Sequence, residues 1–143
     1  MKKLILSAVV LVGCGDPAAP FVGTWRGTTI VSISANGKTV SDSSVGSLAI
    51  SEDLASGNLM LDDGCGSVAT VRGIEFSVIK SSGCVIPRTT GTCRVLLTIA
   101  SGVGLLRNDT LNIAYDGASD FDQCPSGGAP FSGTYKMTFT GNQ

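Results

Sequence analysis

Apolar and polar residues alternate along the chain from Gly23 onward. In the segment 74–80, for example, Ile74, Phe76 and Val78 are separated by single polar residues. A repeat of two residues is typical of a β-strand with one buried face, and no stretch beyond residue 13 keeps a helical repeat of useful length. Eight strands are therefore predicted, around Trp25–Ile33, Leu48–Ile50, Leu59–Leu61, Val68–Arg72, Ile74–Val78, Val95–Ile99, Leu111–Tyr115 and Tyr135–Phe139.

Eight short strands, each with one apolar face, must bury those faces against one another. The pattern predicts an all-β domain in the form of an eight-stranded antiparallel up-and-down barrel, whose closure removes the edge strands. A two-sheet β-sandwich is the alternative, because its strands have similar lengths and spacing. After the first strand, Asn36-Gly37 is typical of a two-residue hairpin turn.

The start of the chain has a different pattern. A basic tripeptide is followed by apolar residues 4–12, which are interrupted by one serine. This layout is typical of a secretory signal peptide, and the apolar stretch is shorter than the roughly 20 residues that a transmembrane helix needs. We therefore expect residues 1–13 to be a signal peptide, residues 14–20 to be a linker that starts with a lipidated Cys14, and residues 21–143 to be the folded domain.

The four residues Leu11-Val12-Gly13-Cys14 resemble the cleavage box of bacterial lipoproteins. The resemblance implies cleavage before Cys14, acylation of that cysteine and lipid anchoring in the bacterial cell envelope, because several acyl chains give stable membrane attachment. Gly15 follows the cysteine, and the absence of aspartate at that position favours the outer membrane. An ordinary secretory signal with an incidental cysteine is the alternative.

Gly23-Thr24-Trp25, at the start of the first predicted strand, resembles the Gly-x-Trp signature of lipocalins and related calycin barrels. The chain is also similar to small bacterial lipoproteins that carry Gly-Thr-Trp strands and paired cysteines. These resemblances imply a lipocalin-like barrel with Trp25 at its closed end, and binding of a small apolar ligand. A plain core aromatic is the alternative interpretation of Trp25.

The chain of 143 residues has no histidine. This excludes Ser-His-Asp and Cys-His nucleophile pairs, acid/base catalysis by histidine, and zinc sites with histidine ligands. The carboxylate pairs Asp62/Asp63 and Asp120/Asp122 are the one basis for catalysis, because paired carboxylates can hydrolyse glycosides. We nevertheless expect a non-catalytic protein without cofactor or metal. The net charge is −1, and −3 once residues 1–13 are removed, so no basic patch is expected to bind nucleic acid.

Four cysteines remain in the predicted domain: Cys65, Cys84, Cys93 and Cys124. An even number in an exported domain indicates two disulfides, for which three connectivities exist. If the strands alternate in direction, all four cysteines lie at one end of the barrel, where Cα atoms can approach within about 7 Å. We expect the pairs Cys65–Cys84 and Cys93–Cys124. Zinc is the less favoured alternative, because no Cys-x-x-Cys is present.

Inward-facing aromatic residues and one methionine are the candidates for ligand binding: Trp25, Phe76, Tyr115, Tyr135 and Met137. The same side chains could fill the interior, and a filled core is the favoured interpretation. In that case the protein would be an envelope interaction protein, or an inhibitor of a secreted enzyme, that acts through the loops of its cysteine-bearing end. A cavity above about 300 Å³ at that end would favour ligand binding, whereas an exposed aromatic patch around Phe121, Pro130 and Phe131 would favour a protein partner.

Overall fold

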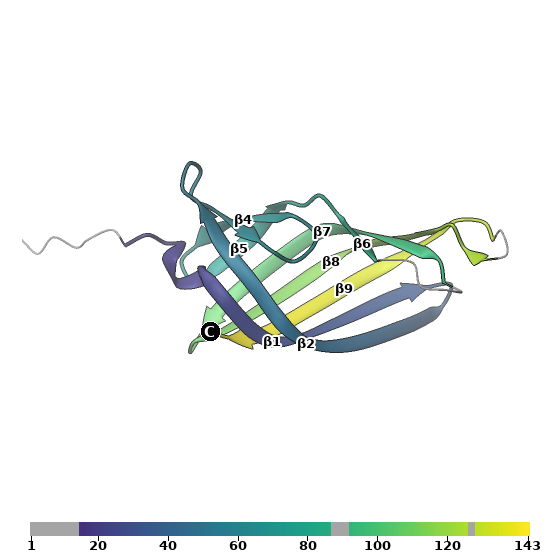
Figure 1. The fold of residues 1–143 in the computed structure, drawn as a ribbon, viewed down its shortest axis with the longest axis horizontal. Helices are drawn as coiled ribbons and strands as arrows, with labels where there is room; N and C mark the ends of the chain where they lie inside the picture. The colour runs from purple at the N-terminus through teal and green to yellow at the C-terminus, as the bar shows by residue number, and fades with distance from the viewer. Residues whose placement is uncertain (1–14, 87–91, 126–127) are drawn as a thin grey trace, which may run out of the picture.

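The structure is a computed structural model, and it describes residues 15–86, 92–125 and 128–143 (Figure 1). The predicted signal peptide and Cys14 lie outside the described residues. A short 3-10 turn, η1 (Ala19–Phe21), precedes nine strands. They are β1 (Gly23–Ala35), β2 (Lys38–Asp53), β3 (Asn58–Leu61), β4 (Ser67–Arg72), β5 (Glu75–Lys80), β6 (Cys84–Ile86), β7 (Arg94–Arg107), β8 (Thr110–Asp122) and β9 (Phe131–Asn142).

All nine strands belong to one antiparallel sheet in the order β5-β4-β3-β2-β1-β9-β8-β7-β6, and a further pairing of β5 with β7 closes the sheet into a ring. The first and last strands pair from Arg26 with Asn142 to Ser34 with Thr134. The closing contact between β5 and β7 is shorter, from Glu75 with Leu105 to Ser77 with Val103. The predicted all-β class and the antiparallel up-and-down order are confirmed, and one sheet replaces the alternative of two packed sheets.

The predicted number of strands was wrong, because the sheet contains nine strands instead of eight. The additional strand is β6, which pairs Cys84 with Leu97 and Ile86 with Val95 on the edge of β7. A strand of three residues is too short to show a repeat of two in the sequence. It forms here because β7 continues past β5 and offers a free edge for pairing.

The predicted hairpin between the first two strands is confirmed. Ala35 pairs with Lys38 across a two-residue turn, in which Asn36 and Gly37 have φ angles of 51° and 71°. Positive φ at both central residues is the geometry that favours Asn-Gly in such turns. This turn lies at one end of the elongated molecule, while η1 and the C-terminus lie at the other end (Figure 1).

Most of the core lies where the short strands β3, β4 and β5 complete the ring, and we call this part, together with η1, the closed half. Val95, Leu97 and Tyr135 extend the core beyond it. Trp25 is 2% exposed and donates its ring N–H to the carbonyl of Phe21 over 2.8 Å. The Phe21 ring meets Phe76 edge to face, with centroids 5.4 Å apart. Phe76 in turn lies directly over Gly104, where a Cβ atom would collide with the ring. An aromatic on one strand opposite glycine on the next fills the interior, so this end is closed by side chains.

Candidate functional site

Unequal strand lengths leave part of the sheet open. β3 has 4 residues, whereas β2 has 16 and β7 has 14. Because β3 reaches only the end of β2, residues 38–48 of β2 pair with β1 alone among the described parts of the chain. We call the section beyond β3 the open half; it consists of 29–44 of the β1–β2 hairpin, β6, 94–99 of β7, 116–122 of β8 and 131–137 of β9.

Three adjoining cavities follow the inner face of the sheet from the middle of the molecule into the open half. The central cavity, of about 260 Å³, is lined by Thr29, Ser44, Gly46, Ser47, Leu48, Asp62, Asp63, Tyr115, Met137 and Phe139. The middle cavity, of about 220 Å³, is lined by Val31, Ile33, Val40, Asp42 and Ser44. The distal cavity, of about 450 Å³, is lined by Ile33, Ala35, Asn36, Lys38, Val40, Phe121 and Phe131. Shared lining residues join the three, and together we call them the groove.

The outer part of the groove is apolar although it is open to solvent. Val40 points to the inner face, opposite Ile33, and is nevertheless 71% exposed. On β8 and β9, which follow β1 in the order of the sheet, the rings of Phe121 and Phe131 stack with centroids 4.4 Å apart. An exposed apolar surface of this kind, inside a concave sheet, is typical of a surface that another molecule covers.

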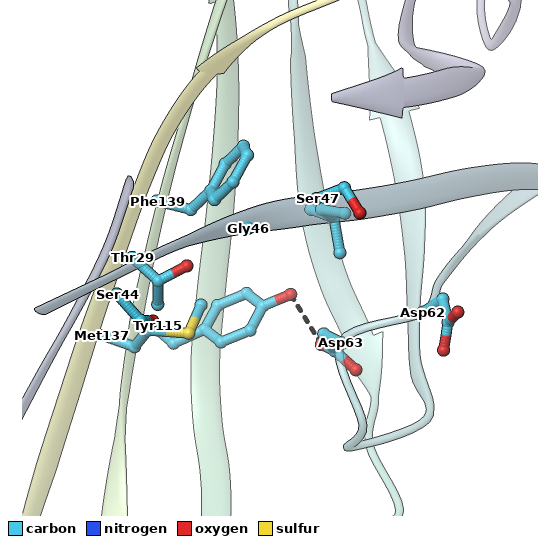
Figure 2. A pocket seen from close by; sticks show the side chains of 10 residues that line it. Thr29, Ser44, Gly46, Ser47, Asp62, Asp63, Tyr115, Met137 and Phe139 are labelled. Carbon is cyan, nitrogen blue, oxygen red and sulfur yellow. Dashed lines mark hydrogen bonds between the residues drawn. The ribbon is translucent and has the colours of Figure 1, made fainter. Parts of the chain in front are cut away.

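The inner part of the groove contains a partly buried polar contact between Tyr115 and Asp63 (Figure 2). The Tyr115 hydroxyl donates to Oδ2 of Asp63 over 2.9 Å, and Oδ1 of Asp63 accepts the backbone N–H of Cys65 over 2.9 Å. Burial raises the pKa of Tyr115 far above its usual value, and the negative charge of Asp63 raises it further. The Ser67 hydroxyl opposes this shift, although it makes no hydrogen bond of ordinary geometry among the described residues. Tyr115 therefore stays protonated and acts as a fixed donor at neutral pH.

The loop that carries Asp63 is held in place by a disulfide. Cys65 is bonded to Cys84, and the carbonyl of Cys65 accepts the backbone N–H of Ser82 over 2.9 Å. At the far end of the groove, the second disulfide joins Cys93 to Cys124. The expected pairing of the four cysteines thus agrees with the structure, and both bridges stabilise the margin of the groove.

The structure separates the five predicted ligand-binding residues into two groups. Tyr115 and Met137 line the central cavity. Trp25, Phe76 and Tyr135 are 2%, 1% and 2% exposed and belong to the packed core. The interior is thus filled around the second group and hollow around the first.

Sequence reasoning missed several lining residues of the groove. Gly46, in the middle of β2, lines the central cavity with nothing within 4 Å of the place where its Cβ would be. A glycine inside a strand was a signal that could have been used, since such a position often faces a close approach of another group. Val40 and Ile33 belong to an ordinary repeat of two residues. This repeat is the same whether the inner face of a strand is packed or open to solvent.

Three of the four carboxylates that were considered as a basis for catalysis are held in structural contacts. Asp120 accepts the Ser132 hydroxyl over 2.6 Å. Asp122 forms an ion pair with Arg94 across β7 and β8, and the guanidinium lowers the pKa of this carboxyl. Asp63 is engaged by Tyr115. Within the described ranges, no three His, Cys, Asp or Glu side chains are grouped so that they could hold a metal ion.

A further hollow, of about 570 Å³, lies at the opposite end of the molecule. Trp25 contributes to its wall, but this residue is almost completely covered, and most of the other lining side chains are polar: Asn108, Asp109, Thr110, Asn142 and Gln143. The Gln143 amide donates to the carbonyl of Val22 over 3.0 Å, so the C-terminus lies beside the start of β1. The lining of this hollow is more polar than that of the distal cavity, so the groove is the stronger candidate for a binding site of an apolar molecule.

In the part of the chain that the structure describes, no helix is long and apolar enough to cross a membrane. Comparisons of the chain with protein-family models, with curated proteins and with solved structures found no match.

Proposed function

We propose that this protein is a non-catalytic, lipid-anchored lipoprotein of the bacterial cell envelope, with a lipocalin-like barrel that binds a small apolar ligand in the groove. The observation that carries the proposal is the row of three joined cavities on the inner face of the sheet. The distal cavity, of about 450 Å³, lies within the roughly 300–1,000 Å³ range of small-molecule sites. It opens at the cysteine-bearing end, where a cavity was expected to favour ligand binding.

Within this proposal the five candidate residues have two roles. Tyr115 and Met137 contact the ligand, because they line the central cavity. Trp25 and Phe76 act through packing in the closed half, and Tyr135 acts through packing on β9 in the open half. Their substitution would change the shape of the site without removing a direct contact.

The position of the chain ends supports the proposed anchoring. The linker after Cys14 leads into η1, which lies at the closed end beside the C-terminus (Figure 1). An acyl anchor on Cys14 would therefore place the closed half near the membrane surface and direct the distal cavity away from it. The outer membrane is the proposed location. Accumulation of an uncleaved precursor in cells treated with globomycin supports this anchoring, and normal processing in treated cells contradicts it.

Ligand binding is tested by titration calorimetry with 1-decanol, a neutral molecule with one apolar chain. The protein is the full chain with Cys14→Ser, so that no acyl group of its own competes for the groove. We expect saturable binding, and we expect Gly46→Leu to weaken it by at least about tenfold because the new side chain fills the central cavity. Val45→Leu is the matched control, since Val45 is adjacent, 86% exposed and on the outer face. Equal affinity of both variants and the parent would contradict the proposed site.

The second candidate is an envelope interaction protein, or an inhibitor of a secreted enzyme. The half-exposed stack of Phe121 and Phe131, next to the exposed Pro130, favours it. Native mass spectrometry of the protein isolated from its own envelope separates the two candidates. A retained small molecule supports ligand binding, and a stoichiometric protein partner supports the second candidate.

A further inference from the structure

The groove has an uneven distribution of charge along its length. Two carboxylates, Asp62 and Asp63, line the central cavity, and Asp42 lines the middle cavity. Among the residues that the structure describes, neither lysine nor arginine lines these two cavities. Lys38 lines the distal cavity at the tip of the β1–β2 hairpin, and the other residues there are mostly apolar. The groove therefore has an acidic inner part and an apolar outer part.

The two carboxylates of the central cavity differ in their availability. Asp63 already accepts hydrogen bonds from Tyr115 and from the loop backbone, so its position is fixed. Asp62 is exposed, and its carboxylate makes no hydrogen bond in the ranges that the structure describes. Both residues come from the loop after β3, beside the unpaired edge of β2 (Figure 2). A positively charged group in the central cavity would meet one fixed and one adjustable carboxylate.

We propose that the ligand of the groove is a cationic single-chain amphiphile, whose protonated amine lies in the central cavity and whose apolar chain extends through the middle cavity to Phe121 and Phe131. This inference rests on the proposed ligand-binding function and specifies the class of ligand. In the central cavity an ammonium head gains charge-assisted hydrogen bonds to the carboxylates, whereas the carboxylate of a fatty acid in the same place meets like charges. A neutral alcohol fills the same apolar space without either effect.

Three ligands with the same ten-carbon chain test this inference: decylamine, which is protonated at pH 7, 1-decanol and sodium decanoate. Calorimetric titration uses the full chain with Cys14→Ser at low ionic strength, because salt screens exposed charges. We expect decylamine to bind at least about tenfold more tightly than 1-decanol, and decanoate to bind most weakly. Equal affinities of decylamine and decanol, or tighter binding of decanoate, would overturn the inference while leaving the apolar groove in place. If none of the three ligands binds, the proposed function fails as well.

The substitution Asp62→Asn tests whether the preference for decylamine over decanol comes from the carboxylates of the central cavity. The side chain of this exposed residue makes no hydrogen bond or ion pair in the described ranges, and its backbone N–H, which donates to the carbonyl of Ala49, is unchanged in the variant, so the substitution is expected to leave the fold intact. We expect the variant to lose several-fold in affinity for decylamine and little for decanol. Asp109→Asn is the control: it removes the same charge in the turn between β7 and β8, at the closed end. Equal effects of the two variants on decylamine binding would overturn the assignment to the groove.

Discussion

The closed and open halves are built from the same long strands and differ in what covers their inner face. In the closed half, β3, β4 and β5 complete the ring, and η1 brings Phe21 against Trp25 and Phe76. In the open half, residues 38–48 of β2 pair with β1 alone among the described residues, and Val40 remains exposed. Strand length thus divides one sheet into a closed section and a section with an open, concave inner face.

If the groove is the binding site that we propose, this division separates the residues that determine stability from those that determine binding. Side chains buried in the closed half contribute hydrophobic free energy to folding, about 25 cal/mol for each Å² of apolar surface removed from water. Side chains of the open half, such as Val40 and Phe131, retain exposed apolar surface that is available to a ligand. We therefore expect substitutions in the two halves to affect different measurements.

The largest expected effect is on folding. Trp25→Ala removes a side chain that is buried in the closed half and hydrogen-bonded to Phe21, and we expect a loss of about 3–5 kcal/mol in the free energy of unfolding. Ile33→Ala, on the inner face of the same strand in the open half, should cost about 1 kcal/mol or less, because Ile33 is only partly buried. Denaturation in urea measures both values. Similar losses for the two variants would contradict the division into halves.

The disulfides are expected to have the next largest effect. Removing Cys93–Cys124 by a double substitution to serine should cost about 2–4 kcal/mol and should also weaken binding of 1-decanol, because this bridge lies next to the distal cavity. Removing Cys65–Cys84 should release the loop of Asp63 and raise the exposure of Tyr115.

Mass spectrometry of the unreduced protein first tests whether the two disulfides are present. Two bridges lower its mass by four hydrogens, and four free thiols would refute both pairs.

A smaller effect is expected on the pKa values of the tyrosines. The chain contains two tyrosines, and their ionisation can be followed by ultraviolet absorbance. Burial raises the pKa of Tyr135 to about 12, with a further contribution from the charge of Asp63, and burial raises the pKa of Tyr115 still higher. A raised tyrosine pKa stabilises the fold below the unfolded value near 10, and this contribution is lost as the pH rises from about 10 to 12.

Spectrophotometric titration of the folded protein should therefore show little tyrosinate at pH 10.5, where the unfolded protein in urea shows a majority of it. Tyr115→Phe leaves Tyr135 as the one remaining reporter and separates the two contributions. If both tyrosines of the folded protein titrate near pH 10, the Tyr135 side chain is exposed to solvent, and the expected burial in the open half is wrong.

Local patterns predicted much of the sheet and little of the groove. The repeat of two located the strand around Phe76, and Asn36-Gly37 located the hairpin, because both depend on neighbouring residues. The alternation of strand direction also placed the four cysteines at one end. By contrast, residues 41–47 of β2 are mostly small and polar, so the sequence did not indicate how far this strand extends beyond its neighbour β3.

The contact between Tyr115 and Asp63 illustrates what the sequence could not predict. These residues are 52 positions apart, and they meet because a disulfide holds the loop of Asp63 against the sheet. Neither residue has a local signal for the other. The acidic part of the groove therefore became visible only when the strands, the loop and the bridge were placed together.

The central claim, that the groove binds a ligand while the closed half does not, is tested most directly by two methionines. Met137 lines the central cavity, and Met60 lies on β3 in the closed half, 50% exposed on the outer face. NMR spectra of protein with ¹³C-labelled methionine methyl groups are recorded during titration with 1-decanol. We predict a saturable shift of the Met137 signal with an unchanged Met60 signal. A shift of Met60 alone, or of neither signal at saturating decanol, would contradict the account.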